Sequence, residues 1–551
     1  MSSIVSLFNI DPLALFVGAF ILFFSILIIP YSIGFMGRRK GLGVYYSYIF
    51  LTLVTSLGAV FASNLIVFIV CWGLLGLFLY LLIGFGQQEN TTSTAKKAFI
   101  IIGGTDALML LGIALLWKIS GSFQMDKISI AFNSKTAIAA YVCLAIGAFA
   151  KAGAMPFHSW VPDTAEDAPT PVTAFLPASL DKLLGIYFLA RISLDMFQMN
   201  YAMNTLLMVV GSVTIVAAVM MALIQHDFKR LLGYHAVSQV GYMVLGIGTG
   251  SPIGIAGGLF HMLNHAIYKS CLFLSGGAVE KQAGSTDLDK LGGLVKTMPI
   301  TFVTFLIASF AISGVPPFNG FASKWMIYQG IIDTAREGGH LWILWLVSAM
   351  FGSALTLASF MKLVHAIFLG QPSHEQSVAV EKKGEVGPAL WFPTAILASL
   401  CIIFGVFAHQ IPLKLFIFPS IKVPVAFLGL WNTSLATFFI FAGILIGLII
   451  YFLGTIAKVR ETEVFVGGES LEEQPDMRMS GTAFYDTIQE IGILKVIYKL
   501  AARKMFDIYD VGARVTFGLN KILRYIHNGV LSTYLAWCLL GMGILFYVLF
   551  R

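Results

Sequence analysis

The stretch GLFHMLNHAIYKSCLFL, residues 258–274, decides the fold. It lies in an apolar run, 252–278, that is long enough to cross a bilayer as a helix, and it still carries His261, His265 and Lys269. Their spacing of four residues places the three side chains on one face of that helix. A stripe of this kind serves no apolar packing, so it indicates a membrane helix that faces ionisable partners or water.

The composition agrees with a membrane protein. Of 551 residues, 58% are hydrophobic and only 11% are charged, whereas a soluble domain has about 25% charged residues. The formal net charge is +7, which we assign to lysines and arginines of cytoplasmic loops. No basic stripe is interleaved with exposed aromatic residues, so nucleic-acid binding is not expected.

Counting apolar runs of about 20 residues predicts about 14 transmembrane helices. The predicted spans are 10–35, 44–64, 65–86, 97–118, 135–155, 171–192, 203–224, 230–249, 252–278, 298–330, 341–370, 387–409, 434–457 and 530–550. The first apolar run has no basic residue before it and no small-residue cleavage site, so we expect a span and not a cleavable signal.

Positive charges accumulate in the odd-numbered loops of this count, which places those loops in the cytoplasm and the N-terminus outside. The residues are Arg38, Arg39, Lys40, Lys96, Lys97, Lys229, Arg230, Lys281, Lys290, Lys296, Lys382, Lys383, Lys458 and Arg460. The expected location is the inner (cytoplasmic) membrane of a cell, crossed many times.

Residues 458–529 differ from the rest. They begin with a polar segment and continue as an amphipathic stretch, 484–526, in which Lys495 and Lys499 lie on a charged face. We expect a helix along the membrane surface, with breaks at Gly492 and Gly512, followed by a closing span.

Ionisable residues also occur inside other predicted spans. They are Asp106, Lys151, Asp181, Lys182, Lys324, Lys362 and His365. A charge at mid-bilayer costs about 2.5–3.5 kcal/mol, so these groups are expected to face one another or a hydrated cavity. Burial disfavours charged forms, and a chain of Lys, His and Asp through apolar helices is therefore a plausible proton relay.

Simpler interpretations stay open for several of these residues. Lys362 can extend its ammonium to a helix end, and His365 is read most simply as a satisfied core residue. Lys229 lies in HDFKR, 226–230, which is either a cytoplasmic basic cap or part of the path. The acidic loop residues Asp163, Glu166 and Asp167 form either a solvated loop or an entry funnel for protons.

Lys151 and Lys324 lie next to helix breakers. Lys151 precedes Pro156, and Lys324 follows Gly314, Pro316 and Pro317. A broken helix at membrane depth is tolerated where it lines a cavity or contacts protein. Two such helices, about one five-helix unit apart, predict two inverted five-helix repeats with ion sites at the breaks.

The five cysteines stand alone in apolar runs, at Cys71, Cys143, Cys271, Cys401 and Cys538. No CxxC motif or Cys/His cluster occurs, so neither a metal nor a cofactor is expected in this chain. Any redox chemistry belongs to partner subunits.

Four segments stand out together: AKAGAMPFHSWVPDTAEDAPTPVTAFLPASLDKLLGIYFLAR (150–191), ALIQHDFKRLLGYHAVSQVGYM (222–243), HMLNHAIYKSCLFLSGG (261–277) and GVPPFNGFASKW (314–325). In this order and spacing they resemble the antiporter-like, proton-conducting subunits of respiratory complex I. That family includes large subunits of multi-subunit Na⁺/H⁺ antiporters and of energy-converting membrane-bound hydrogenases.

The resemblance implies a role for each matching position. Lys151 is similar to the lysine of the first broken helix, Asp106 to an acidic partner on the neighbouring helix, and Lys182 to a bridging lysine. His261, His265 and Lys269 match the central hydrophilic axis, and Lys324 matches the lysine at the exit. One position departs from the family: in CWGLLGLFLYLLIGF, 71–85, Gly73 stands where the family often has glutamate. The ion pair with the first lysine is then either missing or reassigned to Asp106 or Asp181.

The C-terminal segments FVGGE (465–469), RMSGTAFYDTI (478–488) and LRYIHNGVLSTYLAWCLLGM (523–542) are most similar to hydrogenase-type members. The resemblance implies a subunit of a ferredoxin-linked [NiFe] hydrogenase complex, with iron–sulfur clusters and NiFe in partner subunits. The alternatives are a subunit of a complex I-type NADH/quinone oxidoreductase and a stand-alone cation/proton antiporter. The ion, H⁺ or Na⁺, stays open.

The predicted organisation is an all-α polytopic membrane protein in five parts. These are N-terminal transmembrane helices (1–95), a first antiporter-like repeat (96–250), a second repeat with following helices (251–457), a cytoplasmic-side linker with the lateral amphipathic helix (458–529) and a C-terminal anchor (530–551).

Overall fold

The computed structural model describes residues 7–8, 10–37, 39–336, 339–370, 384–427, 433–453, 481–527 and 529–550. It divides into two compact units, Met1–Glu490 and Ile491–Arg551. Some predictions fall on residues outside these ranges and are not addressed by the structure: the linker over 458–480 and the charges at Arg38, Lys382, Lys383, Lys458 and Arg460.

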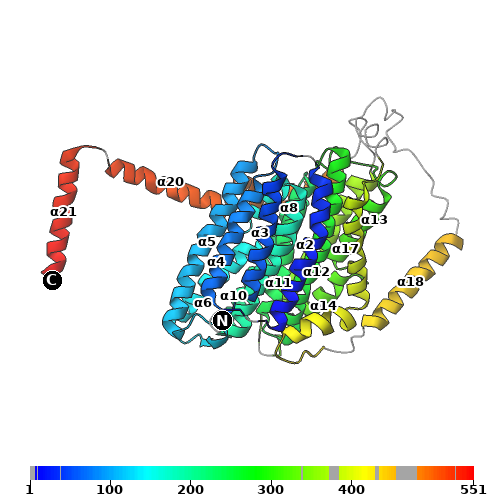
Figure 1. The fold of residues 1–551 in the computed structure, drawn as a ribbon, viewed down its shortest axis with the longest axis horizontal. Helices are drawn as coiled ribbons and strands as arrows, with labels where there is room; N and C mark the ends of the chain where they lie inside the picture. Colours follow the sequence, from blue (N-terminus) through cyan, green and yellow to red (C-terminus); the bar gives the residue numbers. More distant parts are fainter. Residues whose placement is uncertain are drawn as a thin grey trace. The chain divides into compact units, whose positions relative to one another are not determined.

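The first unit is a helical bundle (Figure 1). Its α-helices are α2 Pro12–Met36, α3 Leu42–Phe61, α4 Leu65–Ile83, α5 Thr91–Ser120, α6 Lys135–Ala152, α7 Trp160–Asp167, α8 Thr170–Phe175, α9 Asp181–Arg191, α10 Tyr201–Leu223, α11 Phe228–Gly248, α12 Pro252–Ala283, α13 Pro299–Ser313, α14 Asn319–Asp333, α15 Trp342–Val364, α17 Pro388–Val406 and α18 Thr433–Leu453.

Short elements connect them. The π-helices are η2 Leu176–Leu180, η3 Ile192–Met196, η4 His365–Leu369 and η5 His409–Ile417, and the 3-10 helices are η1 Met125–Lys127, η6 Phe418–Ser420 and η9 Gly481–Glu490. Two short strands, β1 Ile130–Ala131 and β2 Phe197–Gln198, pair in parallel.

Ten helices of the described residues are long and apolar enough to cross a membrane. Several helices of the bundle begin at a side-chain cap: Asp11, Asn64 and Asp227 each accept a hydrogen bond from a backbone N–H of the first turn. The prediction of an all-α polytopic membrane protein is confirmed. The count of about 14 spans and the inverted repeats remain predictions.

Both lysine-bearing helices are broken, as predicted. Helix α6 ends one residue after Lys151, where Gly153 adopts a φ of +82°, and the predicted span 298–330 is two helices, α13 and α14, separated at Gly314 with a φ of +81°. Such left-handed backbone favours glycine. Lys151 therefore lies before its break and Lys324 after its break.

Helix α12 is the centre of the bundle. Every residue from Ile253 to Val279 is buried, and the helix contacts α11, α13, α14 and α17 as well as α8. The side chains of His261, His265 and Lys269 are therefore enclosed by protein.

The second unit contains α19 Gly492–Ala502, α20 Ile508–Ile526 and α21 Leu531–Leu549. The amphipathic stretch is broken at Gly492, as predicted, but the break predicted at Gly512 is wrong, because that residue lies inside α20. The second break precedes Ile508: Lys504 has a φ of +55°, and Asp507 caps α20 by accepting from the Tyr509 N–H. That cap starts a new helix there.

Candidate functional site

Lys151 and Asp106 meet at the side chain of Trp72 on α4. The Lys151 Nζ is 5.0 Å from the centre of the Trp72 ring and donates to the Trp72 carbonyl at 3.4 Å. The indole N–H of Trp72 donates to Asp106 Oδ1 at 2.9 Å. In this part of the described chain, Trp72 therefore joins the two charges and no direct ion pair does.

Asp181 and Lys182 lie at the start of α9, fully buried. No hydrogen-bond partner among the described residues reaches either Asp181 carboxylate oxygen or the Lys182 Nζ. The Lys182 Nζ is 5.4 Å from the centre of the Trp160 ring, and a Cβ at Gly153 would lie 3.3 Å from it. Lys182 thus reaches back to the break of α6, and the Asp181 charge interacts with both Lys151 and Lys182.

Lys269 on α12 continues the line toward the centre of the bundle. Its Nζ, also without a hydrogen-bond partner in the described chain, is 5.7 Å from the ring centre of Phe273 and 5.6 Å from that of Phe360. Its charge interacts with that of Lys182. His265, one turn earlier on α12, interacts with both lysines.

His235 on α11 is a member of the line that the sequence prediction missed. It is buried, its Nε2 is 2.7 Å from Ser359 Oγ, and its ring centre is 4.8 Å from that of Phe360. It interacts electrostatically with both Lys269 and Lys324. The available signal was the four-residue spacing of His235 and Gln239, the same periodicity that marked α12.

Lys324 lies at the second broken helix. Its Nζ donates to the Ile312 carbonyl at 2.9 Å and is 4.7 Å from the centre of the Tyr242 ring. The α13 carbonyls are the negative end of that helix dipole, so the break supplies a site for a cation.

His261 lies beside Lys324 and is fully bonded. Its Nδ1 is 2.9 Å from Ser323 Oγ, and its Nε2 is 3.1 Å from Gln239 Oε1 and 3.3 Å from the Tyr268 hydroxyl. We call this set of buried groups the central line. Its members are Lys151, Asp181, Lys182, His265, Lys269, His235, Lys324 and His261.

Three predicted residues lie apart from the central line. Lys229 donates to the Ala168 carbonyl at 3.1 Å and pairs with Glu280 at 3.5 Å. Lys362 donates to the Leu223 carbonyl at 2.8 Å, which caps the end of α10. His365 is exposed at the start of η4, so its interpretation as a core residue is wrong: it lies on the outer face of the turn that continues α15.

The acidic loop is tied into the bundle by ion pairs. Asp163 pairs with Lys97 at 2.8 Å and with Arg230 at 3.2 Å, and Glu166 also pairs with Arg230. Asp167 accepts from Thr94. Burial raises the pKa of the Asp167 carboxyl, and the Thr94 hydrogen bond opposes that shift.

The described residues contain no group of three or more His, Cys, Asp and Glu side chains that could hold a metal ion. The central line instead consists of groups that accept and release protons, in low-dielectric surroundings. Groups of this kind can exchange protons when neighbouring side chains or water connect them.

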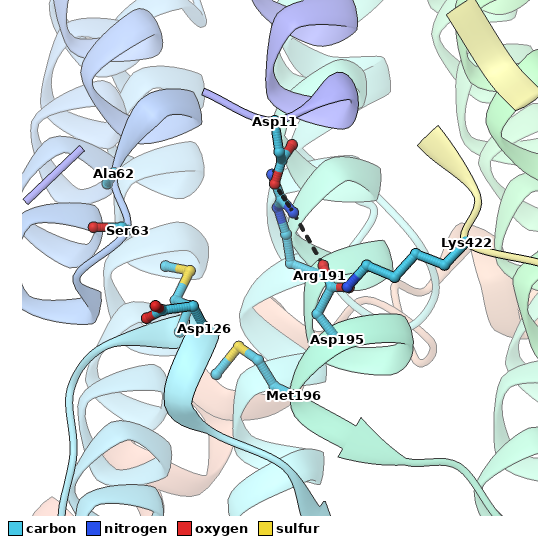
Figure 2. A pocket seen from close by; sticks show the side chains of 9 residues that line it. Asp11, Ala62, Ser63, Asp126, Arg191, Asp195, Met196 and Lys422 are labelled. Carbon is cyan, nitrogen blue, oxygen red and sulfur yellow. Dashed lines mark hydrogen bonds and ion pairs between the residues drawn. The ribbon is translucent and has the colours of Figure 1, made fainter. Parts of the chain in front are cut away.

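A cavity of about 280 Å³ lies at the opposite end of α9 from Lys182 (Figure 2). Arg191 reaches across it to Asp11 at the start of α2 and to Asp195 at 3.0 Å, and Lys422 pairs with Asp195 at 2.6 Å. Asp126 also lines the cavity. These ion pairs join α2, α9 and the segment after η6.

Asp11→Asn is expected to lower the melting temperature more at pH 7 than at pH 3. Partial burial would raise the pKa of the Asp11 carboxyl, but the hydrogen bond and charge of Arg191 outweigh it, and the pKa lies below its usual value. A carboxyl whose pKa is lower in the folded protein than in the unfolded chain stabilises the fold at pH values above its unfolded pKa of about 3.9. This contribution is lost as the pH falls through the pKa of the folded state. Thermal unfolding in detergent at both pH values checks it; an equal loss at both would contradict the ion-pair explanation.

Comparison with known proteins adds a family and a set of relatives. Residues 62–356 match the model of the NADH:quinone oxidoreductase/Mrp antiporter transmembrane family. Na⁺/H⁺ antiporter subunit A1 of Staphylococcus saprophyticus is 33% identical over 403 residues, covering 69% of this chain and 50% of the relative; the protein of the same name in Staphylococcus haemolyticus is 31% identical over 475 residues, covering 81% and 58%. The chain thus spans about half the length of the curated relatives it matches.

Two solved structures share the fold. The Mrp complex from Dietzia sp. DQ12-45-1b matches with a TM-score of 0.68 at 24% identity, over 75% of this chain and 84% of that chain. The membrane-bound sulfane sulfur reductase, described as an archaeal respiratory membrane complex, matches with a TM-score of 0.79 at 24% identity, over 97% of this chain and 88% of that chain.

Proposed function

Because this chain belongs to the NADH:quinone oxidoreductase/Mrp antiporter transmembrane family, we propose that it conducts protons along its central line as one subunit of a multi-subunit membrane complex. The observation that carries the proposal is the burial of eight ionisable side chains that follow one another from Lys151 to Lys324 through the middle of the bundle. Asp106 stands beside the first of them.

The order of the contacts suggests a sequence of steps. A change of charge at the Lys151 end alters the proton affinity of Asp181 and Lys182. Protons then pass by Lys269 and His235 to Lys324 and leave on the outer side. Water bridges Lys182 and Lys269, whose Nζ atoms have no hydrogen-bond partner among the described residues.

For the driving reaction, we propose a redox complex in the inner (cytoplasmic) membrane, most like an energy-converting, ferredoxin-linked [NiFe] hydrogenase. Partner subunits would carry the iron–sulfur clusters and NiFe. Two observations support a respiratory type of complex: the similarity in fold to an archaeal respiratory complex runs through 97% of this chain, and the C-terminal segments resemble hydrogenase-type members. A complex I-type quinone reductase would use the same subunit in the same way.

A second candidate is a subunit of a Na⁺/H⁺ antiporter complex, driven by an ion gradient and not by a redox reaction. The 33% identity to Na⁺/H⁺ antiporter subunit A1 favours it.

The test begins with purification of the assembled complex through a tag on this chain. A nickel-containing or quinone-binding partner supports the redox assignment, and a set of membrane subunits without redox centres supports the antiporter. The complex is then reconstituted into vesicles, and proton uptake is measured with reduced ferredoxin, with NADH and with a Na⁺ gradient. Proton movement under none of these drives would overturn the proposed function.

Lys324→Ala is expected to reduce this proton movement by roughly tenfold or more, because it removes a proton-carrying group at the second break. Lys324→Arg keeps the charge but not the ability to release a proton, so we expect it to reduce proton movement as much as Lys324→Ala does. Full activity of both variants would remove Lys324 from the path.

A further inference from the structure

We infer that Trp72 is the positioning residue of the first half of the path: its indole N–H holds the Asp106 carboxylate, and its ring face holds the Lys151 ammonium. The inference deepens the proposed function and rests on it. It assigns to a neutral side chain the task of keeping an acidic group of α5 beside a lysine of α6.

The setting of Trp72 explains why it can hold both groups. The side chain is fully buried, and two phenylalanines fix its orientation: Phe68 and Phe188 have ring centres 5.1 Å and 5.5 Å from it, and they stack on each other at 4.4 Å. An aromatic cluster of this kind restricts rotation of the indole. The N–H direction, and with it the carboxylate position, is therefore set by packing.

The Asp106 carboxylate of α5 lies against the surface of α4, which has glycine at two nearby positions. Position 73, directly after Trp72, is glycine, and a Cβ added there meets nothing within 4 Å. One turn later, a Cβ added at Gly76 would lie 3.9 Å from Asp106 Oδ2. The carboxylate thus reaches from α5 to the surface of α4, and Trp72 is the residue that anchors it there.

Lys151 stands between an anchored carboxylate and an unanchored one. Its charge interacts with both Asp181 and Asp106. Asp106 is bonded to Trp72, whereas neither oxygen of Asp181 has a hydrogen-bond partner among the residues described. The Trp72 N–H therefore fixes the position of the Asp106 carboxyl and leaves Asp181 as the carboxyl that is free to exchange protons with Lys151 and Lys182.

Trp160 offers a matched control within the same chain. It is also fully buried, and its ring lies 5.4 Å from a lysine Nζ, that of Lys182. Its indole N–H, however, donates to the Ala150 carbonyl at 3.0 Å and not to a carboxylate. Trp→Phe at either position removes one N–H and keeps an aromatic ring beside a lysine. Only Trp72→Phe removes a hydrogen bond to a carboxylate, that of Asp106.

The acidic groups that α7 presents to α5 are already bonded. Helix α7 contributes Asp163 and Asp167 at the far end of α5, where they bind Lys97 and Thr94. Lys151 from α6 is the charged group that interacts with Asp106, and Asp181 from α9 interacts in turn with Lys151. A change in the pH dependence caused by Trp72→Phe can therefore be assigned to the Asp106–Lys151 pair.

The experiment is the pH profile of proton uptake by the assembled complex in vesicles. For Trp72→Phe we expect the midpoint to move to higher pH by about one unit, the size expected for loss of one N–H bond to a carboxylate. Trp160→Phe should leave the midpoint in place. In an Asp106→Asn background, Trp72→Phe should cause no further shift.

A second readout separates this inference from the proposed function. Difference infrared spectroscopy of the purified complex follows the protonation of the Asp106 carboxyl, with Asp106→Asn to assign the band, and needs no transport. If Trp72→Phe fails to assemble, benzothienylalanine at position 72 keeps the shape of the indole and lacks the N–H. An unchanged Asp106 titration in either variant would overturn the role of Trp72, whereas a shifted titration in a complex that moves no protons would overturn only the proposed function.

Discussion

Lys269→Met should reduce proton movement by at least roughly tenfold, since it removes a proton-carrying group from the middle of the path. The same change should leave the melting temperature unchanged or raise it. The Lys269 Nζ is buried without a hydrogen-bond partner among the described residues, and burying an unpaired polar group costs free energy that an apolar side chain of similar length does not. A gain or no change in stability, together with a loss of transport, is the signature of a group retained for function. Proton uptake in vesicles and thermal unfolding of the same preparation measure both.

Lys229→Met is the matched control for this signature. Lys229 is equally buried but has two partners, the Ala168 carbonyl and Glu280. Its removal leaves Glu280 without its cation, so stability is expected to fall by about 1–3 kcal/mol. If Lys269→Met unfolds the protein, or if transport survives it, Lys269 is not the central carrier.

Gly320→Ala should have the largest effect on the fold of the second broken helix. A Cβ at this position would lie 1.8 Å from the Ala311 carbonyl oxygen, so the backbone of α13 or α14 must move. Overpacking of this kind costs about 1–3 kcal/mol or more. Because Lys324 lies one turn further along α14 and bonds the Ile312 carbonyl, the same movement should displace its Nζ. We expect a lower melting temperature and a loss of proton transport together.

Gly103→Ala supplies the comparison. Gly103 lies inside α5, and a Cβ there meets nothing within 4 Å, so the change should be neutral or stabilising by up to about 1 kcal/mol through helix propensity. Similar losses in both variants would show that the effect at Gly320 does not come from the close approach of α13 and α14.

The contacts of the four central lysines share one physical feature. In the described part of the chain, the Nζ atoms of Lys151, Lys182, Lys269 and Lys324 lie between 4.7 and 5.7 Å from aromatic ring centres and form no ion pair. A ring face attracts a cation but carries no net charge. Among the described residues, the charges of Lys269 and Lys324 interact with no carboxylate. These two lysines can therefore lose a proton without leaving a buried carboxylate unpaired, which would be costly. This arrangement suits groups that must alternate between charged and neutral forms.

The sequence by itself determined the membrane class, the broken helices and most members of the central line. Each of these follows from short-range patterns: apolar runs long enough to span a bilayer, Gly and Pro that cannot continue a helix, and the four-residue spacing of His261, His265 and Lys269. These patterns act within one helix, so they do not depend on how the helices pack together.

Only the tertiary structure decided which charges meet. It placed His235 of α11 between Lys269 and Lys324, it put Trp72 between Asp106 and Lys151, and it moved Lys229 and Lys362 to ion-paired and capping positions at helix ends. The reason is physical: the free energy of a buried charge depends on partners from other helices, and the rotation of one helix against another cannot be read from the periodicity of either.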